Sequence, residues 1–187
     1  SRGLGDVYKR QDIIMIGETR DAETAEISVR SAITGHLVVS TLHTNDAISS
    51  IVRLADMGVA PYLISNSVVG IVAQRLVRKV CQFCKYEEPV TAEDIAIVGD
   101  GIPMITRGKG CKVCNNTGYK GRISIHEMVY IDKTLKRMIA RSADSQEMLE
   151  YAKKTQGMRS LMDSAIDLVK EGVTTPEEVM KIAYYSD

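Results

Sequence analysis

The four cysteines of this 187-residue chain stand in two pairs, Cys81–Cys84 and Cys111–Cys114, with two residues inside each pair. Two intervening residues let both sulfurs of a tight turn face one ion, and two such turns supply the four thiolates of a tetrahedral zinc site. Because four thiolates leave no open position for water or substrate, we expect this zinc to be structural.

Disulfide bonds or free thiols are the alternative chemistry for these cysteines. Secreted disulfide scaffolds are usually shorter than this chain and richer in cysteine. Gly110 before the second pair and Gly118 after it permit the tight turns of a metal-binding knuckle, which favours zinc. Metal-binding cysteines that stay reduced are typical of cytosolic proteins.

A carboxylate follows the first apolar segment of the chain. Residues 13–16 are continuously apolar, as in a strand buried on both faces, and Glu18 comes just after them. In a nucleotide-hydrolysing sheet, an acid at this place meets magnesium and the attacking water. A charged residue that merely ends a strand is the simpler interpretation, because such acids are frequent in any open sheet.

A second apolar segment, residues 36–42, ends in a dense run of polar side chains. His43 could donate a hydrogen bond to a phosphate oxygen, and Thr41 or Thr44 could do the same. His36 opens this segment, so a turn between a helix and a strand explains it better than a role in binding.

The elements that position these residues follow from the apolar periodicity. Asp21 is expected to cap a helix that ends at Gly35, and Asp46 to cap a second helix that ends at Gly58. Strand, helix, strand and helix in this order predict an α/β fold with a parallel sheet and crossover helices.

The remaining pattern predicts mostly helices. Residues 61–80 are predicted as one long helix that leads into the first cysteine pair. Further elements are a short helix at 92–98, a strand at 121–131, and helices near 133–141, 145–155, 159–171 and 176–185. Thr175 and Glu178 have the spacing of a capping box for the last helix.

Composition limits the class of protein. The 24 basic and 24 acidic residues cancel, so the net charge gives no support to nucleic-acid binding. The longest apolar stretch, near 68–73, is far short of the ~20 residues that cross a bilayer.

Residues 1–11 lack periodicity and run straight into the first strand, so we interpret them as a non-native lead-in.

Several blocks of the sequence resemble one family. Residues 12–21 (DIIMIGETRD), 34–47 (TGHLVVSTLHTNDA) and 73–78 (AQRLVR) are similar to the ATPases of type II secretion and type IV pilus assembly. Residues 111–122 and 171–175 extend the similarity. The paired cysteines resemble the pilus-extension and type II secretion branch rather than the retraction motors.

The resemblance implies three parts: the C-terminal part of a RecA-like P-loop ATPase core with a mostly parallel sheet in 12–80, a zinc module in 81–122, and a strand with a C-terminal helical bundle in 123–187. It implies a homohexamer that binds ATP and Mg²⁺. It also places the protein in the cytoplasm, peripheral to the inner face of the membrane, where it contacts an inner-membrane platform protein.

The same resemblance assigns roles to residues. Glu18 matches the acid of the Walker B block, and His36 and His43 match two histidines that couple the γ-phosphate state to the subunit interface. We therefore expect these three side chains to line one cleft. The nucleotide-binding residues expected here are Glu18, Arg20, Thr41 and Thr44.

Two departures from the family pattern matter. No G-x-x-x-x-G-K-[ST] loop occurs, so the donors for the β- and γ-phosphates are missing and we expect this chain alone to be inactive. Thr19 stands where the family usually has an aliphatic residue.

Two alternative functions remain. One is a related motor for DNA uptake or conjugation, and the other is a zinc ribbon that binds nucleic acid, with Tyr86 and Tyr119 stacking on bases.

Overall fold

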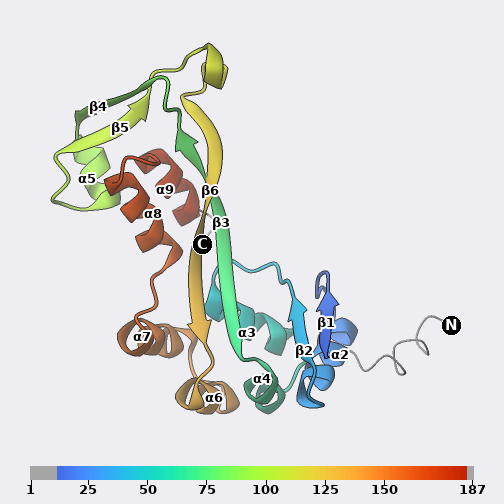
Figure 1. The fold of residues 1–187 in the computed structure, drawn as a ribbon. Helices are drawn as coiled ribbons and strands as arrows, with labels where there is room; N and C mark the ends of the chain where they lie inside the picture. Colours follow the sequence, from blue (N-terminus) through green and yellow to red (C-terminus); the bar gives the residue numbers. More distant parts are fainter. Residues whose placement is uncertain (1–11, 185–187) are drawn as a thin grey trace. The chain divides into compact units, whose positions relative to one another are not determined.

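The computed structural model describes residues 12–184, which form two compact units (Figure 1). One unit contains the described residues up to Ile71 together with Met128–Met158, and the other contains Val72–Glu127 together with the described residues from Arg159 onward. The predicted lead-in, residues 1–11, lies outside the described residues. The units are built from discontinuous stretches, whereas the predicted parts 12–80, 81–122 and 123–187 are continuous.

The first unit begins with a parallel strand pair. Strand β1 (Ile13–Ile16) lies beside β2 (Leu37–Ser40), with Ile13 opposite Leu37 and Ile16 opposite Ser40. Helix α2 (Ala22–Ile33) connects the two strands, and the carboxylate of Asp21 accepts a hydrogen bond from the Thr24 N–H at 2.8 Å. This strand–helix–strand crossover is the one that the sequence predicted.

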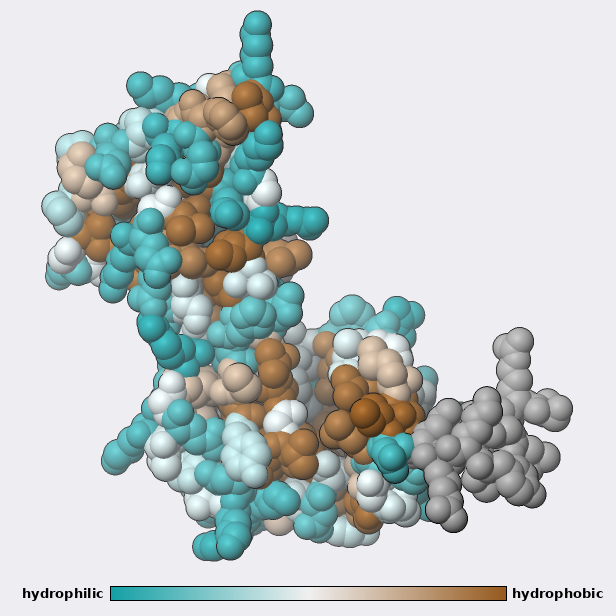
Figure 2. All heavy atoms as spheres, viewed as in Figure 1, coloured by the Kyte–Doolittle hydropathy of each residue, from teal (hydrophilic) through white to brown (hydrophobic). Residues whose placement is uncertain are grey.

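One face of this strand pair is open. Ile13, Met15, Leu37 and Val39 are all exposed, and Figure 2 shows hydrophobic atoms at the surface over this part of the molecule. The prediction of a strand buried on both faces is therefore wrong for β1 in this structure. Parallel sheets are normally covered on both faces.

Helices complete the first unit. Helix α3 (Ala47–Asp56) starts at Asp46, whose carboxylate accepts a hydrogen bond from the Ser49 N–H at 2.7 Å. Helix α4 (Pro61–Ser67) contacts α6 (Lys133–Ala140), and α3 contacts α7 (Ser145–Gln156). Buried apolar side chains from these helices form the core: Ile48, Ile51, Leu54, Ile64, Leu135, Met138, Ile139 and Met148.

The long helix predicted for residues 61–80 is wrong. Helix α4 ends at Ser67, and strand β3 (Gly70–Val80) follows and pairs with β6 (Tyr119–Tyr130). Burial alternates along the middle of β3, with Ala73 and Val77 buried and the residues beside them more exposed. Period-two burial is the signature of a strand.

The second unit contains a strand pair that the sequence did not reveal. Strand β4 (Lys85–Pro89) lies antiparallel to β5 (Met104–Gly108), and the predicted short helix, α5 (Ala92–Val98), lies between them in sequence. Helices α8 (Leu161–Lys170) and α9 (Pro176–Tyr184) pack on each other.

Two parts of the predicted fold class need correction. Across residues 12–184 the sheets are the pairs β1–β2, β3–β6 and β4–β5, so the predicted mostly parallel sheet is reduced here to β1–β2 and the β4–β5 pair is antiparallel. The predicted C-terminal helices are present, but α6 and α7 belong to the first unit and α8 and α9 to the second. A single C-terminal bundle is not confirmed.

The C-terminal helix α9 is tied to the end of β3 by buried polar groups. The Glu178 carboxylate accepts hydrogen bonds from the Arg78 backbone N–H and from its guanidinium, and the Arg78 guanidinium lies 3.9 Å from the centroid of the Tyr119 ring. The hydroxyls of Thr175 and Tyr119 are 2.8 Å apart. The two residues predicted as a capping box thus bind groups on other elements.

In the described part of the chain, no helix is long and apolar enough to span a membrane.

Candidate functional site

The ends of β1 and β2 bring a carboxylate, an imidazole and a guanidinium together. Because the strands are parallel, residues that follow them emerge at the same edge of the sheet. Glu18 Oε1 lies 2.5 Å from His43 Nε2, and Glu18 Oε2 lies 2.6 Å from Arg20 Nη2. The Glu18 side chain is 22% exposed, whereas that of His43 is 85% exposed.

The Glu18 carboxylate is held in its ionised form. The hydrogen bond from Arg20, helped by the charges of Arg20 and His43, lowers the pKa of Glu18 below its usual value, although burial acts in the opposite direction. Its Oε1 atom is buried and, among the described residues, has no hydrogen bond of ordinary geometry despite the close His43 nitrogen. An ionised carboxylate has lone pairs beyond those facing Arg20 and His43, and these can accept a hydrogen bond from water or bind a cation.

Hydrogen bonds join the two strand ends directly beside this pair. The Thr19 N–H donates to the Thr41 carbonyl at 2.9 Å, and the Thr41 hydroxyl donates to the Gly17 carbonyl at 2.7 Å. The hydroxyls of Thr19 and Ser40 lie 2.8 Å apart. The Thr41 hydroxyl, predicted to contact nucleotide, is therefore engaged within the protein.

His36 lies apart from the other predicted site residues. It precedes β2, at the opposite end of the strand from His43, and its Nδ1 is 3.1 Å from the Ser31 carbonyl oxygen near the end of α2. This arrangement matches a histidine in a turn between a helix and a strand. The structure does not bring His36 into one cleft with Glu18 and His43.

A pocket of about 390 Å³ opens beside His43. Its lining residues all belong to the first unit and are His43, Thr44, Asn45, Ser49, Val52, Arg53, Asp56 and Ser145. The predicted nucleotide-binding residue Thr44 is among them, and its hydroxyl lies 2.8 Å from that of Ser50. Sequence reasoning missed Arg53 and Asp56, although their helical spacing from Ser49 places all three on one face of α3.

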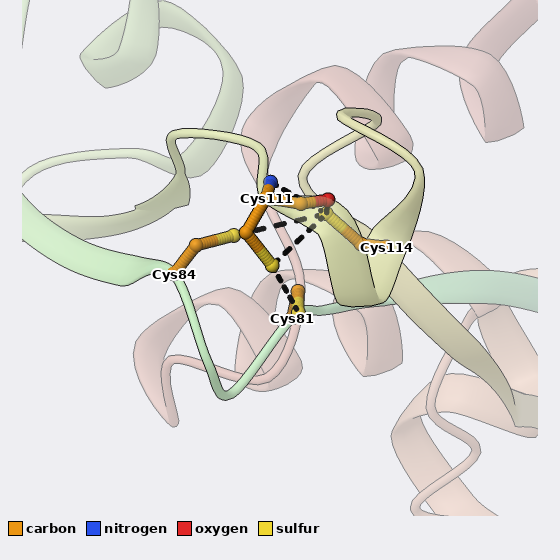
Figure 3. A group of neighbouring side chains, drawn as sticks. All are labelled: Cys81, Cys84, Cys111 and Cys114. Carbon is orange, nitrogen blue, oxygen red and sulfur yellow. Dashed lines mark hydrogen bonds between the residues drawn. The ribbon is translucent and has the colours of Figure 1, made fainter.

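The four cysteines converge on one point, as Figure 3 shows. The Sγ atoms of Cys81 and Cys111 are 3.9 Å apart, those of Cys84 and Cys114 are 3.9 Å apart, and those of Cys111 and Cys114 are 3.7 Å apart. Disulfide sulfurs lie about 2.05 Å apart, so these are four free thiols. Four sulfurs around one zinc, each about 2.3 Å from the ion, would be about 3.8 Å apart, so the donor set fits zinc.

Backbone groups shape the electrostatics of the cysteine cluster. Burial raises the pKa of the Cys84 thiol to about 12. Burial also acts to raise the pKa of Cys114, but hydrogen bonds from the N–H groups of Cys111 and Gly118 and from the neighbouring thiols outweigh it and lower that pKa to about 6. The Cys111 N–H donates to Cys114 Sγ at 3.2 Å. Such N–H···S contacts favour a thiolate, the form that binds metal.

Two glycines allow the two ends of the segment that carries the second cysteine pair to approach closely. A Cβ atom added at Gly108 would lie 2.2 Å from the carbonyl oxygen of Gly118, and one added at Gly118 would lie 2.6 Å from that of Gly108. Gly118 also has a φ of +78°, a conformation that favours glycine. This contact brings β5 against the segment that follows the second cysteine pair.

The surface of this cysteine module carries exposed apolar and basic side chains. Phe83, inside the first cysteine pair, is 72% exposed, and Lys120 Nζ lies 5.7 Å from its ring centroid. Tyr119, one of the rings predicted to stack on bases in the nucleic-acid alternative, is covered by Arg78 and bound through its hydroxyl to Thr175. That ring is therefore not a free stacking platform.

Comparisons with known proteins agree on one family. The model of the type II/IV secretion system protein family matches residues 7–181. The chain is 44% identical over 188 residues to a type II secretion system protein E of Pseudomonas aeruginosa, covering 97% of this chain and 37% of that protein. It is 43% identical over 174 residues to the type IV pilus assembly ATPase PilB of Thermus thermophilus, covering 90% of this chain and 20% of that protein. The chain thus spans less than two fifths of the length of these relatives.

Solved structures share the fold. The pilus retraction motor PilT with bound ADP superposes with a TM-score of 0.65 at 24% identity, covering 96% of this chain and 41% of that one. The Legionella pneumophila ATPase DotB superposes with a TM-score of 0.63 at 18% identity, covering 97% of this chain and 41% of that one. The predicted α/β ATPase fold is confirmed at this level.

Proposed function

Because the chain belongs to the type II/IV secretion system protein family, as its sequence blocks predicted, we propose that it is part of an ATPase that drives assembly of a type IV pilus or a type II secretion pseudopilus. The names of the relatives, a type II secretion system protein E and the type IV pilus assembly ATPase PilB, support this proposal. In the parent protein, the subunits form a cytoplasmic homohexamer that acts on an inner-membrane platform protein.

The single observation that carries the proposal is the Glu18 carboxylate at the carboxyl edge of β1, ionised and in contact with His43. An acid at this edge accepts a hydrogen bond from the attacking water and orients it toward the γ-phosphate. Bound Mg²⁺ would neutralise charge on the phosphates. Arg20 and Thr44 lie beside the pair and are proposed contacts of the nucleotide.

His36 is proposed to act in a different place from His43. His36 lies at the amino end of β2. Within one subunit it is therefore too far from Glu18 to contact the nucleotide that Glu18 would act on. A role at the boundary with a neighbouring subunit, where it would sense the γ-phosphate state of that neighbour, agrees with this position.

The cysteine cluster is proposed to hold one structural zinc through Cys81, Cys84, Cys111 and Cys114. The sulfur–sulfur distances of 3.7–3.9 Å and the glycines that close the turn of the second cysteine pair support this assignment. With four thiolate ligands the ion has no open position, so its contribution is to fold stability. The module then shapes a surface for partners.

The exposed face of the β1–β2 pair supports a larger core in the parent protein. Ile13, Met15, Leu37 and Val39 form an apolar face of a parallel sheet, and such sheets are usually covered on both sides. We propose that the remainder of the nucleotide-binding domain, with its phosphate-binding loop, covers this face.

The test is ATP hydrolysis by the full-length protein that contains this chain. Glu18→Gln keeps the shape of the side chain and removes its charge, so turnover is expected to fall by about 10²–10⁴-fold while nucleotide binding is kept. Glu26→Gln, which alters an exposed ion pair with Arg30 on α2, is the matched control and should hydrolyse ATP at the normal rate. Normal turnover in the Glu18 variant would overturn the proposed function.

A further inference from the structure

We propose that Thr19, Ser40 and Thr41 are positioning residues that form a hydrogen-bonded clasp and hold Glu18 and His43 at a fixed separation. This inference rests on the proposed function and assigns new roles within the same site. The clasp consists of the Thr19–Thr41 backbone hydrogen bond, the Thr41–Gly17 hydrogen bond and the contact between the hydroxyls of Thr19 and Ser40.

Both residues that flank Glu18 are part of the clasp. Gly17 accepts the Thr41 hydroxyl at 2.7 Å, and Thr19 donates its N–H to the Thr41 carbonyl at 2.9 Å. His43 follows Thr41 by two residues. A single residue of the second strand end, Thr41, therefore holds the backbone on both sides of the carboxylate.

The buried hydroxyl of Thr19 strengthens this connection. Thr19 is only 4% exposed, and its hydroxyl lies 2.8 Å from the Ser40 hydroxyl. A buried hydroxyl without a partner is destabilising, so the Thr19 side chain favours the arrangement in which Ser40 stays opposite it.

The clasp matters because, apart from the contact with Glu18 itself, little packing holds His43. Its side chain is 85% exposed, so packing does not fix the imidazole, and the position of the ring depends on the backbone that carries it. A displacement of about 1 Å in a catalytic group can cost about 10²-fold in rate. Thr41 is therefore expected to affect the chemical step while leaving nucleotide affinity unchanged.

The kinetic test uses the full-length protein with Thr41→Val and Thr41→Ser. Thr41→Val removes the hydroxyl at nearly constant volume, and kcat is expected to fall at least tenfold with an unchanged dissociation constant for ADP. Thr41→Ser keeps the hydroxyl and should retain kcat within about threefold. Thr155→Val, at an exposed position of α7, is the control for the exchange itself and should match the unaltered protein.

A double-mutant cycle separates positioning from general stability. If Thr41 acts through His43, Thr41→Val should cost much less in a His43→Ala background than in the unaltered protein. An equal cost in both backgrounds overturns the proposal, as does an unchanged kcat. Weaker ADP binding with an unchanged kcat would instead make Thr41 a phosphate ligand.

A measurement without turnover keeps the proposal distinct from the proposed function. In this chain, Glu18→Gln should shift the NMR resonance of the His43 ring, and Thr41→Val should reduce that shift by at least half. A full shift in the Thr41 variant overturns the clasp. Loss of the shift in a parent protein that hydrolyses no ATP supports the clasp and refutes the proposed function.

Discussion

Removing the charge of Glu178 should destabilise the second unit strongly. Glu178 is 4% exposed, and its carboxylate accepts hydrogen bonds from the Arg78 backbone N–H at 2.9 Å and from the Arg78 guanidinium at 2.8 and 2.9 Å. Lys181 Nζ lies 2.6 Å from the same carboxylate. These contacts join α9 to the end of β3, three residues before the first cysteine of the cluster, Cys81.

The size of the effect follows from these contacts. A hydrogen bond to a charged group contributes about 1.5–3 kcal/mol, against about 0.5–1.5 kcal/mol between neutral groups. Glu178→Gln keeps the shape but leaves one acceptor oxygen, because the amide nitrogen is a donor. It therefore cannot accept both the Arg78 backbone N–H, now bound at Oε2, and the guanidinium, now bound at Oε1, so at least one hydrogen bond to a charged group, about 1.5–3 kcal/mol, is lost. Because the Arg78 side chain is 42% exposed, solvent screens part of this, and we expect a loss of about 2–3 kcal/mol in the free energy of unfolding.

Urea unfolding of the chain at pH 7, followed by circular dichroism, measures this loss. Glu171→Gln, an exposed position at the end of α8, is the matched control and should change the free energy of unfolding by less than about 0.5 kcal/mol. A loss in the Glu178 variant as small as that of the control would refute the reasoning, because it would mean that the ion pair and its hydrogen bonds contribute nothing net.

The pH dependence gives an independent check on the same contact. Burial acts to raise the pKa of Glu178, but the hydrogen bonds from Arg78 and Lys181 outweigh it and lower the pKa below its ordinary value. A group with a lowered pKa in the folded state stabilises the protein above its unfolded pKa, and this stability is lost as the pH falls through the folded value. The difference between the unaltered chain and the Glu178→Gln variant should therefore be constant near pH 7 and shrink below about pH 4.5.

Three further predictions concern the zinc module and the activity of the chain. Elemental analysis of the reduced chain should find one zinc per chain, and its absence would contradict the zinc assignment. Cys84→Ser should increase hydrogen exchange in residues 81–122 while leaving the β1–β2 pair protected. Gly108→Ala should weaken zinc binding at least tenfold, since its Cβ would lie 2.2 Å from the Gly118 carbonyl oxygen, whereas Gly17→Ala, where nothing lies within 4 Å, should bind zinc normally in a competition titration. The chain alone should hydrolyse no ATP in a phosphate-release assay, and turnover that Glu18→Gln abolishes would contradict this.

Local signals predicted the helices well. Asp21 and Asp46 each accept a hydrogen bond from a backbone N–H of the first turn, which is the capping interaction that their residue type favours. The prediction of one helix over residues 61–80 was wrong because a run of apolar residues fits a buried helix or a strand equally well. The β-branched residues and Gly70 within this run were the signals for a strand, because both disfavour a helix interior.

The strands of the cysteine module could not be predicted from their own residues. Strand β4 (Lys85–Pro89) has a mixed polar sequence with a terminal proline, so it shows neither an apolar run nor clear alternation. Its partner β5 is distant in sequence, and the two are brought together by the loop that contains α5. In the same way, the ion-pair partners of Arg107, the buried Asp94 and the half-buried Glu88, are visible only once the strands are paired.

The candidate catalytic pair depends on the register of two four-residue strands, and the structure shows what sets that register. The Leu37 N–H donates to the Asp12 carbonyl at one end of the pair, and the Thr19 N–H donates to the Thr41 carbonyl at the other, both at 2.9 Å. A slip of one residue would turn every side chain of a strand to the opposite face. Sequence alone could place Glu18 and His43 just beyond their strands, because parallel strands end at the same edge. The contact between them requires this particular register, which the Thr19–Thr41 hydrogen bond holds at the end nearest the site.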